Sequence, residues 1–205
     1  MPRKTKDEAQ KTRAAILLAA EKCFYARGVV RTSLQEIAQA AGVTRGAVYW
    51  HFKDKVALLR TIADNTLLPY EALLEGLATK ELDDPLGDLH ATCCETFQTM
   101  VHNVGARRVF TILTKRCEYI EEMVPLMRRS QECRDRVLDR LISIFKQAQR
   151  KKELATCWTV PIAARALQNM FLGFMISEME YSRPSAARDS HYRDVIDVFF
   201  RVLRA

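Results

Sequence analysis

The segment "TRGAVYWHFKDK", residues 44–55, carries an unusual run of rings and positive charges. Four ring-bearing residues stand in a row in it: Tyr49, Trp50, His51 and Phe52. Three cations accompany them: Arg45, Lys53 and Lys55. Because neighbouring side chains on a helix point about 100° apart, four consecutive rings cannot all be buried in one core. Some of the rings must face water or a partner, and the cations predict a negatively charged partner.

A short helix over this segment would suit the major groove of DNA. Arg45 can bond the edge of a guanine through two parallel hydrogen bonds, and Gly46 lets the first turn approach a surface closely. The tyrosine hydroxyl, the lysine ammonium and the N–H groups at the helix start can bond phosphates. Val48 and Phe52 should be core, and a wholly buried aromatic cluster is the alternative that the flanking cations disfavour. The predicted DNA contacts here are Thr44, Arg45, Gly46, Tyr49, Trp50, His51 and Lys55.

Two helices upstream are expected to hold this segment in place. A first helix is predicted from about residue 8 to 27, and Gly28 ends it as a C-terminal cap. Ser33 and Glu36 have the spacing of a capping box, so a second, short helix should begin at Leu34. Both helices have apolar residues at helical spacing, which predicts one buried face on each.

The sequence between this short helix and the next predicts a tight turn. Gly42 closes the first of the two helices, and Thr44 can cap the second, which should run to about Trp50. Ala38 is small where the two helices would touch. A glycine at the turn and small residues at the contact are what a helix-turn-helix needs, so residues 33–52 are predicted to form one.

The positive charge of the chain is confined to its first third. The formal net charge is +7. Residues 1–60 hold 12 Lys or Arg against 5 Asp or Glu, whereas residues 61–205 hold 20 of each kind. This division predicts a polyanion-binding domain over residues 1–60, joined to a neutral domain over residues 61–205. A merely solvated basic surface is the alternative.

The composition favours an all-α protein. Seven Gly and six Pro in 205 residues leave little room for β-hairpins, and apolar residues recur with the period of a helix. The longest apolar run, residues 14–20, is too short to cross a bilayer. The first ten residues lack the apolar region of a secretory signal, so we expect a cytoplasmic protein that does not enter the membrane.

The six cysteines show no CxxC pair, and two of them are adjacent. This spacing predicts neither a zinc ribbon nor a disulfide framework. We expect reduced and mostly buried thiols. Cys117, beside two cations, is the best candidate for a redox-sensitive thiol.

Residues 61–205 are predicted to form a helical bundle. A long fourth helix, capped by Asp54, should be kinked or broken at Pro69, because proline removes a backbone donor. Asp84 and Pro85 are suited to begin the next helix. Further helices are expected around Val109 and over about 125–151, 160–181 and 190–204. The last two are apolar around most of their circumference, which predicts a covering partner.

The stretch "RTSLQEIAQAAGVTRGAVYWHFKDK" resembles the DNA-binding domain of the TetR family of bacterial regulators. The likeness extends upstream through "RKTKDEAQKTRAAILLAAEKCF". Together with "DDPLGDL" and "KRCEYIEEM", that pattern is similar to the AcrR-type branch, whose members are local repressors of multidrug efflux pumps. The likeness is dense over residues 3–60 and patchy to about residue 125.

This resemblance implies a nine-helix homodimer that binds a palindromic operator in double-stranded DNA. The first three helices would bind DNA, and the eighth and ninth, about 160–181 and 190–204, would form the dimer face. The start of the second helix would add DNA contacts from Thr32, Ser33 and Gln35. A ligand would move the fourth helix and spread the two reading helices, which must lie roughly 34–36 Å apart to fit adjacent half-sites.

The resemblance also implies a pocket for a small hydrophobic or cationic inducer. Ordinary core packing is the alternative for each candidate position. At Leu67 some AcrR-type members carry a carboxylate that this chain lacks. The candidate positions are Leu67, Leu89, Cys93, Phe97, Phe110, Leu113, Glu118, Val137, Leu141, Phe171, Phe174 and Met175.

Enzyme motifs are missing from the sequence. It has no GxSxG, HExxH, P-loop or GxGxxG pattern, and its four histidines are scattered. We therefore expect no catalysis, no cofactor and no metal. Two alternatives to an efflux repressor stay open. One is a regulator of the same fold that serves a metabolic or signalling operon with a different inducer, and the other is a nonspecific DNA-coating protein.

Overall fold

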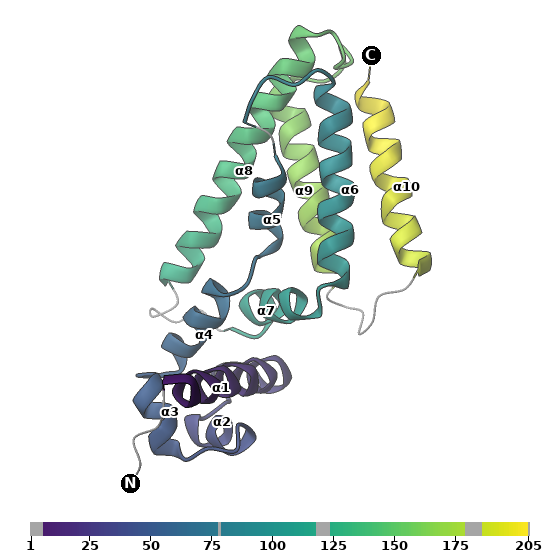
Figure 1. The fold of residues 1–205 in the computed structure, drawn as a ribbon. Helices are drawn as coiled ribbons and strands as arrows, with labels where there is room; N and C mark the ends of the chain where they lie inside the picture. Colours follow the sequence, from purple (N-terminus) through teal and green to yellow (C-terminus); the bar gives the residue numbers. More distant parts are fainter. Residues whose placement is uncertain (1–5, 78, 118–123, 179–185, 205) are drawn as a thin grey trace. The chain divides into compact units, whose positions relative to one another are not determined.

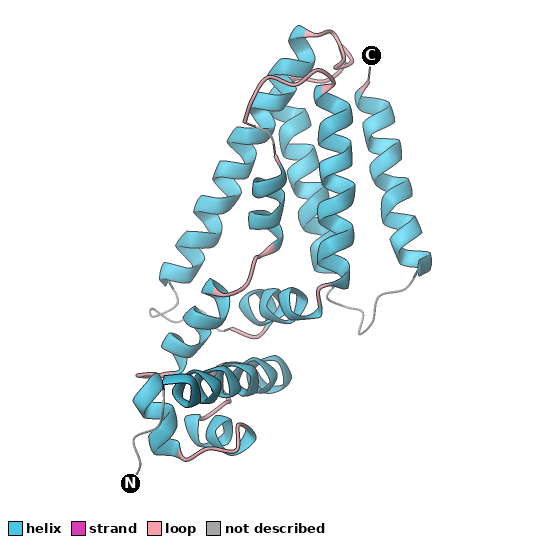
Figure 2. Cartoon of the chain, in the orientation of Figure 1, coloured by secondary structure: helices cyan, strands magenta, loops and turns pink. Residues whose placement is uncertain are grey.

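The computed structural model describes residues 6–77, 79–117, 124–178 and 186–204, which fold into helices joined by short loops (Figure 1). No strand occurs among these residues (Figure 2). An isolated antiparallel bridge joins Leu154 to Arg204. The all-α prediction is therefore confirmed. The helices are α1 (Lys6–Arg27), α2 (Leu34–Ala40), α3 (Arg45–His51), α4 (Lys55–Asp64), α5 (Pro69–Gly76), α6 (Pro85–His102), α7 (Val104–Lys115), α8 (Val124–Arg150), α9 (Val160–Glu178) and α10 (Ala186–Leu203).

The described residues contain ten helices where nine were predicted, because the expected fourth helix is two helices. Helix α4 ends at Asp64, and α5 begins at Pro69. Proline fits the first position of a helix, where its missing N–H would have no intrahelical partner in any case. The predicted interruption at Pro69 is confirmed as a break.

The chain forms two compact units. The first comprises Met1–Leu68 with Gly105–Met127, and the second comprises Pro69–Val104 with Arg128–Ala205. Most of helix α7 thus belongs with α1–α4. The division of the structure therefore differs from the predicted boundary at residue 60.

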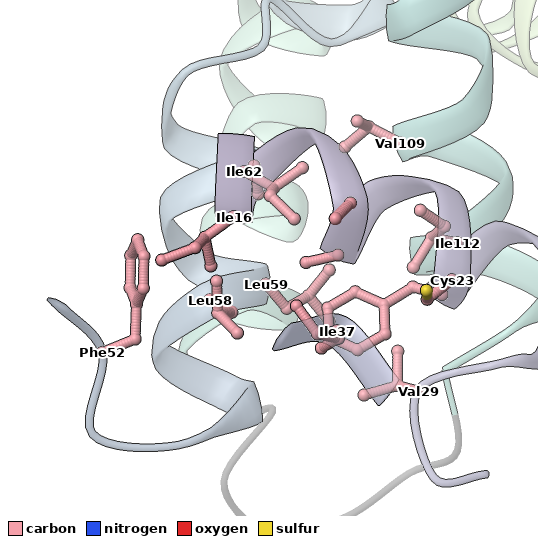
Figure 3. Packing of buried hydrophobic residues seen from close by; sticks show 14 of the residues in the cluster. Ile16, Cys23, Val29, Ile37, Phe52, Leu58, Leu59, Ile62, Val109 and Ile112 are labelled. Carbon is pink, nitrogen blue, oxygen red and sulfur yellow. The ribbon is translucent and has the colours of Figure 1, made fainter. Parts of the chain in front are cut away.

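One hydrophobic cluster holds the first unit together (Figure 3). Ile16 of α1, Ile37 of α2 and Leu58 of α4 are completely buried in it. Val109 and Ile112 join the same cluster, which explains why α7 belongs to this unit. Burying a side chain of this size contributes roughly 1.5–3 kcal/mol, so the cluster fixes the arrangement of the short helices α2 and α3, which could not stand alone.

In the second unit, α6 packs against both α5 and α10 (Figure 1). The α6 start follows the predicted pattern, with Asp84 as cap and Pro85 in the first turn. Gln147 of α8 secures the loop that leads into α6. Its side chain accepts a hydrogen bond from the N–H of Leu82 at 2.9 Å and donates to the carbonyl of Lys80 at 3.2 Å. A buried amide that satisfies two backbone groups of a loop fixes that loop on the bundle.

All six cysteines lie within the described ranges as reduced thiols. The prediction that most are buried holds for three of them, Cys23, Cys93 and Cys133. Cys94 and Cys117 are partly exposed, and a redox role for Cys117 stays a prediction. In the part of the chain that the structure describes, no helix combines the length and apolar character that a membrane span requires.

Candidate nucleic-acid interface

Local hydrogen bonds fix both ends of α2, including the turn that leads into α3. At the start of α2, the Ser33 hydroxyl accepts from the Glu36 N–H at 3.2 Å, and the Ser33 N–H donates to the Glu36 carboxylate at 2.8 Å. At its end, Gly42 takes a φ of +67°, and the N–H of Val43 donates to the carbonyl of Ala38 at 3.0 Å. This is the Schellman arrangement, in which a left-handed glycine closes a helix. The predicted capping box and turn glycine are confirmed.

The capping box also sets the ionisation of Glu36. The backbone N–H of Ser33 is the largest reason that the pKa of Glu36 lies below its ordinary value, followed by the Ser33 hydroxyl. The Arg27 guanidinium, which forms an ion pair with the same carboxylate, lowers it further. The start of α2 is thus stabilised by a charged carboxylate.

Helix α3 divides its rings between the core and the solvent. Thr44 caps the helix, with its hydroxyl accepting from the Ala47 N–H at 3.2 Å. Val48 is fully buried and Phe52 is 4% exposed, as predicted. Tyr49 is 48% exposed and Trp50 is 71% exposed. Two adjacent large rings left in water do not stabilise the unit, so their exposure indicates a contact surface.

Arg45 is restrained on the surface of α3 by Tyr49. The Arg45 guanidinium donates to the Tyr49 hydroxyl at 3.0 Å, and its Cζ lies 5.3 Å from the centre of the tyrosine ring. The two residues are four apart, so they share one face of the helix. A guanidinium has five N–H donors, and this contact orients it without using all of them.

A shallow depression of about 520 Å³ brings α3 together with the segment before and at the start of α2. Four cations and one carboxylate line it. Six of the ten residues predicted to contact DNA meet there: Thr32, Ser33, Gln35, Arg45, Tyr49 and Lys55. The other four lie outside its lining: Thr44, Gly46, Trp50 and His51. A concave, basic, ring-bearing surface is suited to a phosphate backbone and the base edges beside it.

The DNA contact predicted for Thr32 stays a prediction, because Thr32 lines the depression while its side chain is engaged within the protein. Thr32 is only 1% exposed, and its hydroxyl donates to the carbonyl of Gly28 at 2.8 Å. Since the group is buried and occupied, it secures the loop between α1 and α2. Ser33 is exposed, but its hydroxyl and its N–H are both engaged by the capping box.

Lys55 has an internal role that the sequence did not predict. Its Nζ donates to the carbonyl oxygens of Val29 and Val30, both at 2.9 Å. The N–H of Val29 in turn donates to the carbonyl of Arg116 at 3.0 Å, so this loop is held from α4 and from the end of α7. Lys55 therefore fixes one wall of the depression, and a phosphate contact through its third N–H stays a prediction.

Two exposed cations of the depression were not in the predicted set. Arg31 and Lys53 both line it. Lys53 lies in the ring-bearing run, and its charge was an available signal. Arg31 is placed by the loop after α1, whose irregular path follows from Lys55 and Thr32 and not from any periodic pattern.

The predicted inducer positions fall into both units and stay predictions. Leu67 is 42% exposed, whereas Phe110 and Leu113 pack in the first unit. Glu118 lies outside the described residues. Those in the second unit are buried or half-buried: Leu89, Cys93, Phe97, Val137, Leu141, Phe171, Phe174 and Met175.

The structure joins two of these positions to a ring that the prediction omitted. Phe97, Phe174 and Tyr192 form an aromatic trio, with ring centres 4.6–5.6 Å apart. The trio links α6, α9 and α10. Tyr192 lies far along the chain from Phe97, and only the packing of α10 reveals the contact.

Comparison with known proteins identifies the family of the chain. The family model described as "Bacterial regulatory proteins, tetR family" matches residues 16–62, a range that includes the whole depression. The chain is 38% identical to the HTH-type transcriptional repressor BepR of Brucella suis over 203 residues, which cover 99% of this chain and 97% of BepR. The chain belongs to the TetR family.

Two further relatives agree with this assignment. The HTH-type transcriptional regulator TtgR of Pseudomonas putida is 37% identical over 158 residues, 75% of each chain. The crystal structure of NalD, described as the secondary repressor of the MexAB-OprM multidrug efflux pump in Pseudomonas aeruginosa, gives a TM-score of 0.78 at 36% identity. That likeness covers 97% of this chain and 98% of NalD. TetR-family repressors bind operator DNA and act as dimers, so this chain is a DNA-binding transcriptional regulator.

Proposed function

We propose that this chain represses a neighbouring multidrug efflux operon and that small lipophilic or cationic ligands release it from its operator. The observation that carries the proposal is the surface of α3, which exposes Tyr49 and Trp50 beside a basic depression while Val48 anchors the helix. NalD, which is described as the repressor of an efflux pump, resembles the chain along almost its whole length.

In the proposed complex, α3 enters the major groove of the operator. Arg45, oriented by Tyr49, bonds a base edge, most favourably the O6 and N7 atoms of guanine. Arg31 and Lys53 bond phosphates on either side of that base pair. Trp50 and His51, whose rings meet edge to face at 4.5 Å, lie against the sugar–phosphate wall.

The proposed dimer face is formed by α9 and α10. Both helices leave large apolar side chains exposed in the single chain: Ile162, Ile176, Val198 and Val202. A second copy of the chain would cover them, and two copies related by a two-fold axis match a palindromic operator. The dimer then sets the spacing of the two α3 helices.

The proposed inducer binds in the apolar interior of the second unit, beside the trio of Phe97, Phe174 and Tyr192. Aromatic side chains offer broad faces to lipophilic and cationic molecules. A ligand that binds the spread dimer more tightly than the DNA-bound dimer shifts the equilibrium by that difference in affinity.

Titration of the purified chain onto labelled DNA from upstream of its own gene tests the proposal. A scrambled duplex of equal length and composition is the control, at near-physiological salt. A specific repressor should prefer the upstream DNA by roughly 10³–10⁷-fold, and lipophilic efflux substrates should reduce that binding. Equal affinity for both duplexes, with an equal fall in both as salt rises, would contradict the proposal.

A further inference from the structure

Three potential metal ligands converge in the second unit, outside the DNA-binding surface. His90 and Cys94 lie on α6, and Asp197 lies on α10. The imidazole nitrogen, the thiol sulfur and a carboxylate oxygen of these residues all lie within 4.8 Å of one another. The His90 Nε2 is 2.6 Å from the Asp197 Oδ1 and 3.8 Å from the Cys94 Sγ.

The fold brings this cluster together from both local and distant sequence. His90 and Cys94 are four residues apart, so both project from the same face of α6. Helix α10 packs against α6 (Figure 1). This packing brings Asp197 to His90, although the two residues are 107 positions apart in the sequence. Phe200 of α10 meets the His90 ring edge to face, with ring centres 5.0 Å apart, and this contact restrains the imidazole.

The donor set matches the preference of one class of ion. Imidazole, thiolate and carboxylate together are ligands for Zn²⁺ and its neighbours Co²⁺ and Ni²⁺, whereas Mg²⁺ and Ca²⁺ prefer oxygen alone. With Zn–N and Zn–O bonds of about 2.0–2.1 Å and a Zn–S bond of about 2.3 Å, donor atoms of a tetrahedral site lie roughly 3.3–3.6 Å apart. The observed separations bracket these values, so side-chain adjustments of about 1 Å would complete the geometry.

We propose that His90, Cys94 and Asp197 bind a single Zn²⁺-class ion, with its fourth position open to solvent. The ion would replace the hydrogen bond between His90 and Asp197 and would bind Cys94 as the thiolate, whose proton passes to solvent. A thiolate and a carboxylate together neutralise the two charges of the ion. The His90 and Asp197 side chains are 34% and 42% exposed, which leaves a path for the ion and room for a water ligand.

The surroundings are compatible with this ion. A depression of about 270 Å³ is lined by His90, Asp197, Phe200, Arg201 and Arg204. Arg204 is paired with Asp84 on the surface at 3.3 Å, which offsets part of its charge. His90, Cys94 and Asp197 each offer one ligand atom, so the site should hold one ion per chain.

The ordinary alternative is an ion pair between His90 and Asp197 beside an uninvolved thiol, and Co²⁺ distinguishes the two. The full chain, stripped of metal with a chelator, is titrated with Co²⁺ and followed by absorption. The proposed site gives a thiolate-to-cobalt charge-transfer band and intense visible bands of a tetrahedral ion, saturating at one ion per chain. Zn²⁺ should then displace Co²⁺ and abolish both bands. An ion pair alone gives neither band.

Variants locate the ligands. Cys94→Ser should remove the charge-transfer band. His90→Gln and Asp197→Asn should each weaken Zn²⁺ binding by at least about 100-fold, since even the loss of an outer-shell partner costs 10–100-fold. Cys157→Ser is the matched control, because it removes an exposed thiol elsewhere and should leave the titration unchanged. Far-UV circular dichroism checks that each variant is folded.

Three results would overturn the proposal: no charge-transfer band in the wild-type chain, a band that survives Cys94→Ser, or a band lost in Cys157→Ser. If Cys94→Ser does not fold, the result rests on His90→Gln and Asp197→Asn, where unchanged Zn²⁺ affinity in both variants would exclude the site.

Discussion

Lys55 gives the sharpest test of how the DNA-binding surface is held, and Lys55→Met removes its charge while keeping most of its length. The variant loses hydrogen bonds from Nζ to the carbonyls of Val29 and Val30, each 2.9 Å long in the wild type. A hydrogen bond to a charged group contributes about 1.5–3 kcal/mol. The bond to Val29 is partly buried, so we assign it this whole contribution to the stability, whereas the exposed bond to Val30 contributes less than about 1 kcal/mol.

We therefore expect Lys55→Met to destabilise the first unit by about 2–3 kcal/mol. For a chain of this size, that lowers the melting temperature by roughly 4–12 °C. Thermal and urea denaturation, followed by far-UV circular dichroism, measure the change. Lys53→Met is the matched control, because it removes an exposed charge from the same depression and should alter stability by less than about 0.5 kcal/mol. Equal stability of the two variants would refute the internal role of Lys55.

Three further predictions use the same denaturation assays. Trp50→Ala should keep the wild-type stability within about 0.5 kcal/mol but weaken operator binding, whereas Ile37→Ala should lower the stability by about 2–5 kcal/mol because Ile37 is fully buried. A larger loss of stability in Trp50→Ala than in Ile37→Ala would contradict the assignment of surface and core. Gly28→Ala should lower the stability by about 1–2 kcal/mol, because Gly28 has a φ of +86° and an added Cβ would lie 3.3 Å from the Arg116 carbonyl oxygen. An unchanged melting temperature would show that the alanine is not strained there. Because the pKa of Glu36 is lowered by folding, the charged carboxylate stabilises the fold at pH values above its ordinary pKa of 4.5, and this stabilisation is lost as the pH falls through the lowered pKa. Acid should therefore destabilise the wild type more than Glu36→Gln, and parallel profiles of stability against pH for the two proteins would contradict this prediction.

Local sequence signals predicted the elements of the DNA-binding surface well. The capping box of Ser33 and Glu36, the left-handed Gly42 and the cap at Thr44 each depend on residues within a few positions, and all three appear as expected. The division of α3 into a buried face at Val48 and an exposed ring at Trp50 follows from helical periodicity alone.

Contacts between distant residues account for what the sequence did not predict. Lys55 bonds the loop after α1 across 25–26 residues, which adds a structural role to the predicted phosphate contact. Thr32 was assigned to DNA by family resemblance, but its burial depends on how that loop folds back on Gly28. Asp197 meets His90 only because α10 packs on α6, and no spacing rule spans 107 residues.

The most direct test of the central claim, that α3 reads operator sequence, compares the wild type with Arg45→Ala on the operator and on its single-base-pair variants at fixed salt. The claim predicts that wild-type Arg45 contributes about 1–3 kcal/mol of discrimination at one base pair in each half-site, and that Arg45→Ala loses this discrimination while it keeps the preferences at other positions. An equal loss of affinity on every duplex, with all preferences retained, would mean that Arg45 holds only the DNA backbone and would contradict the account.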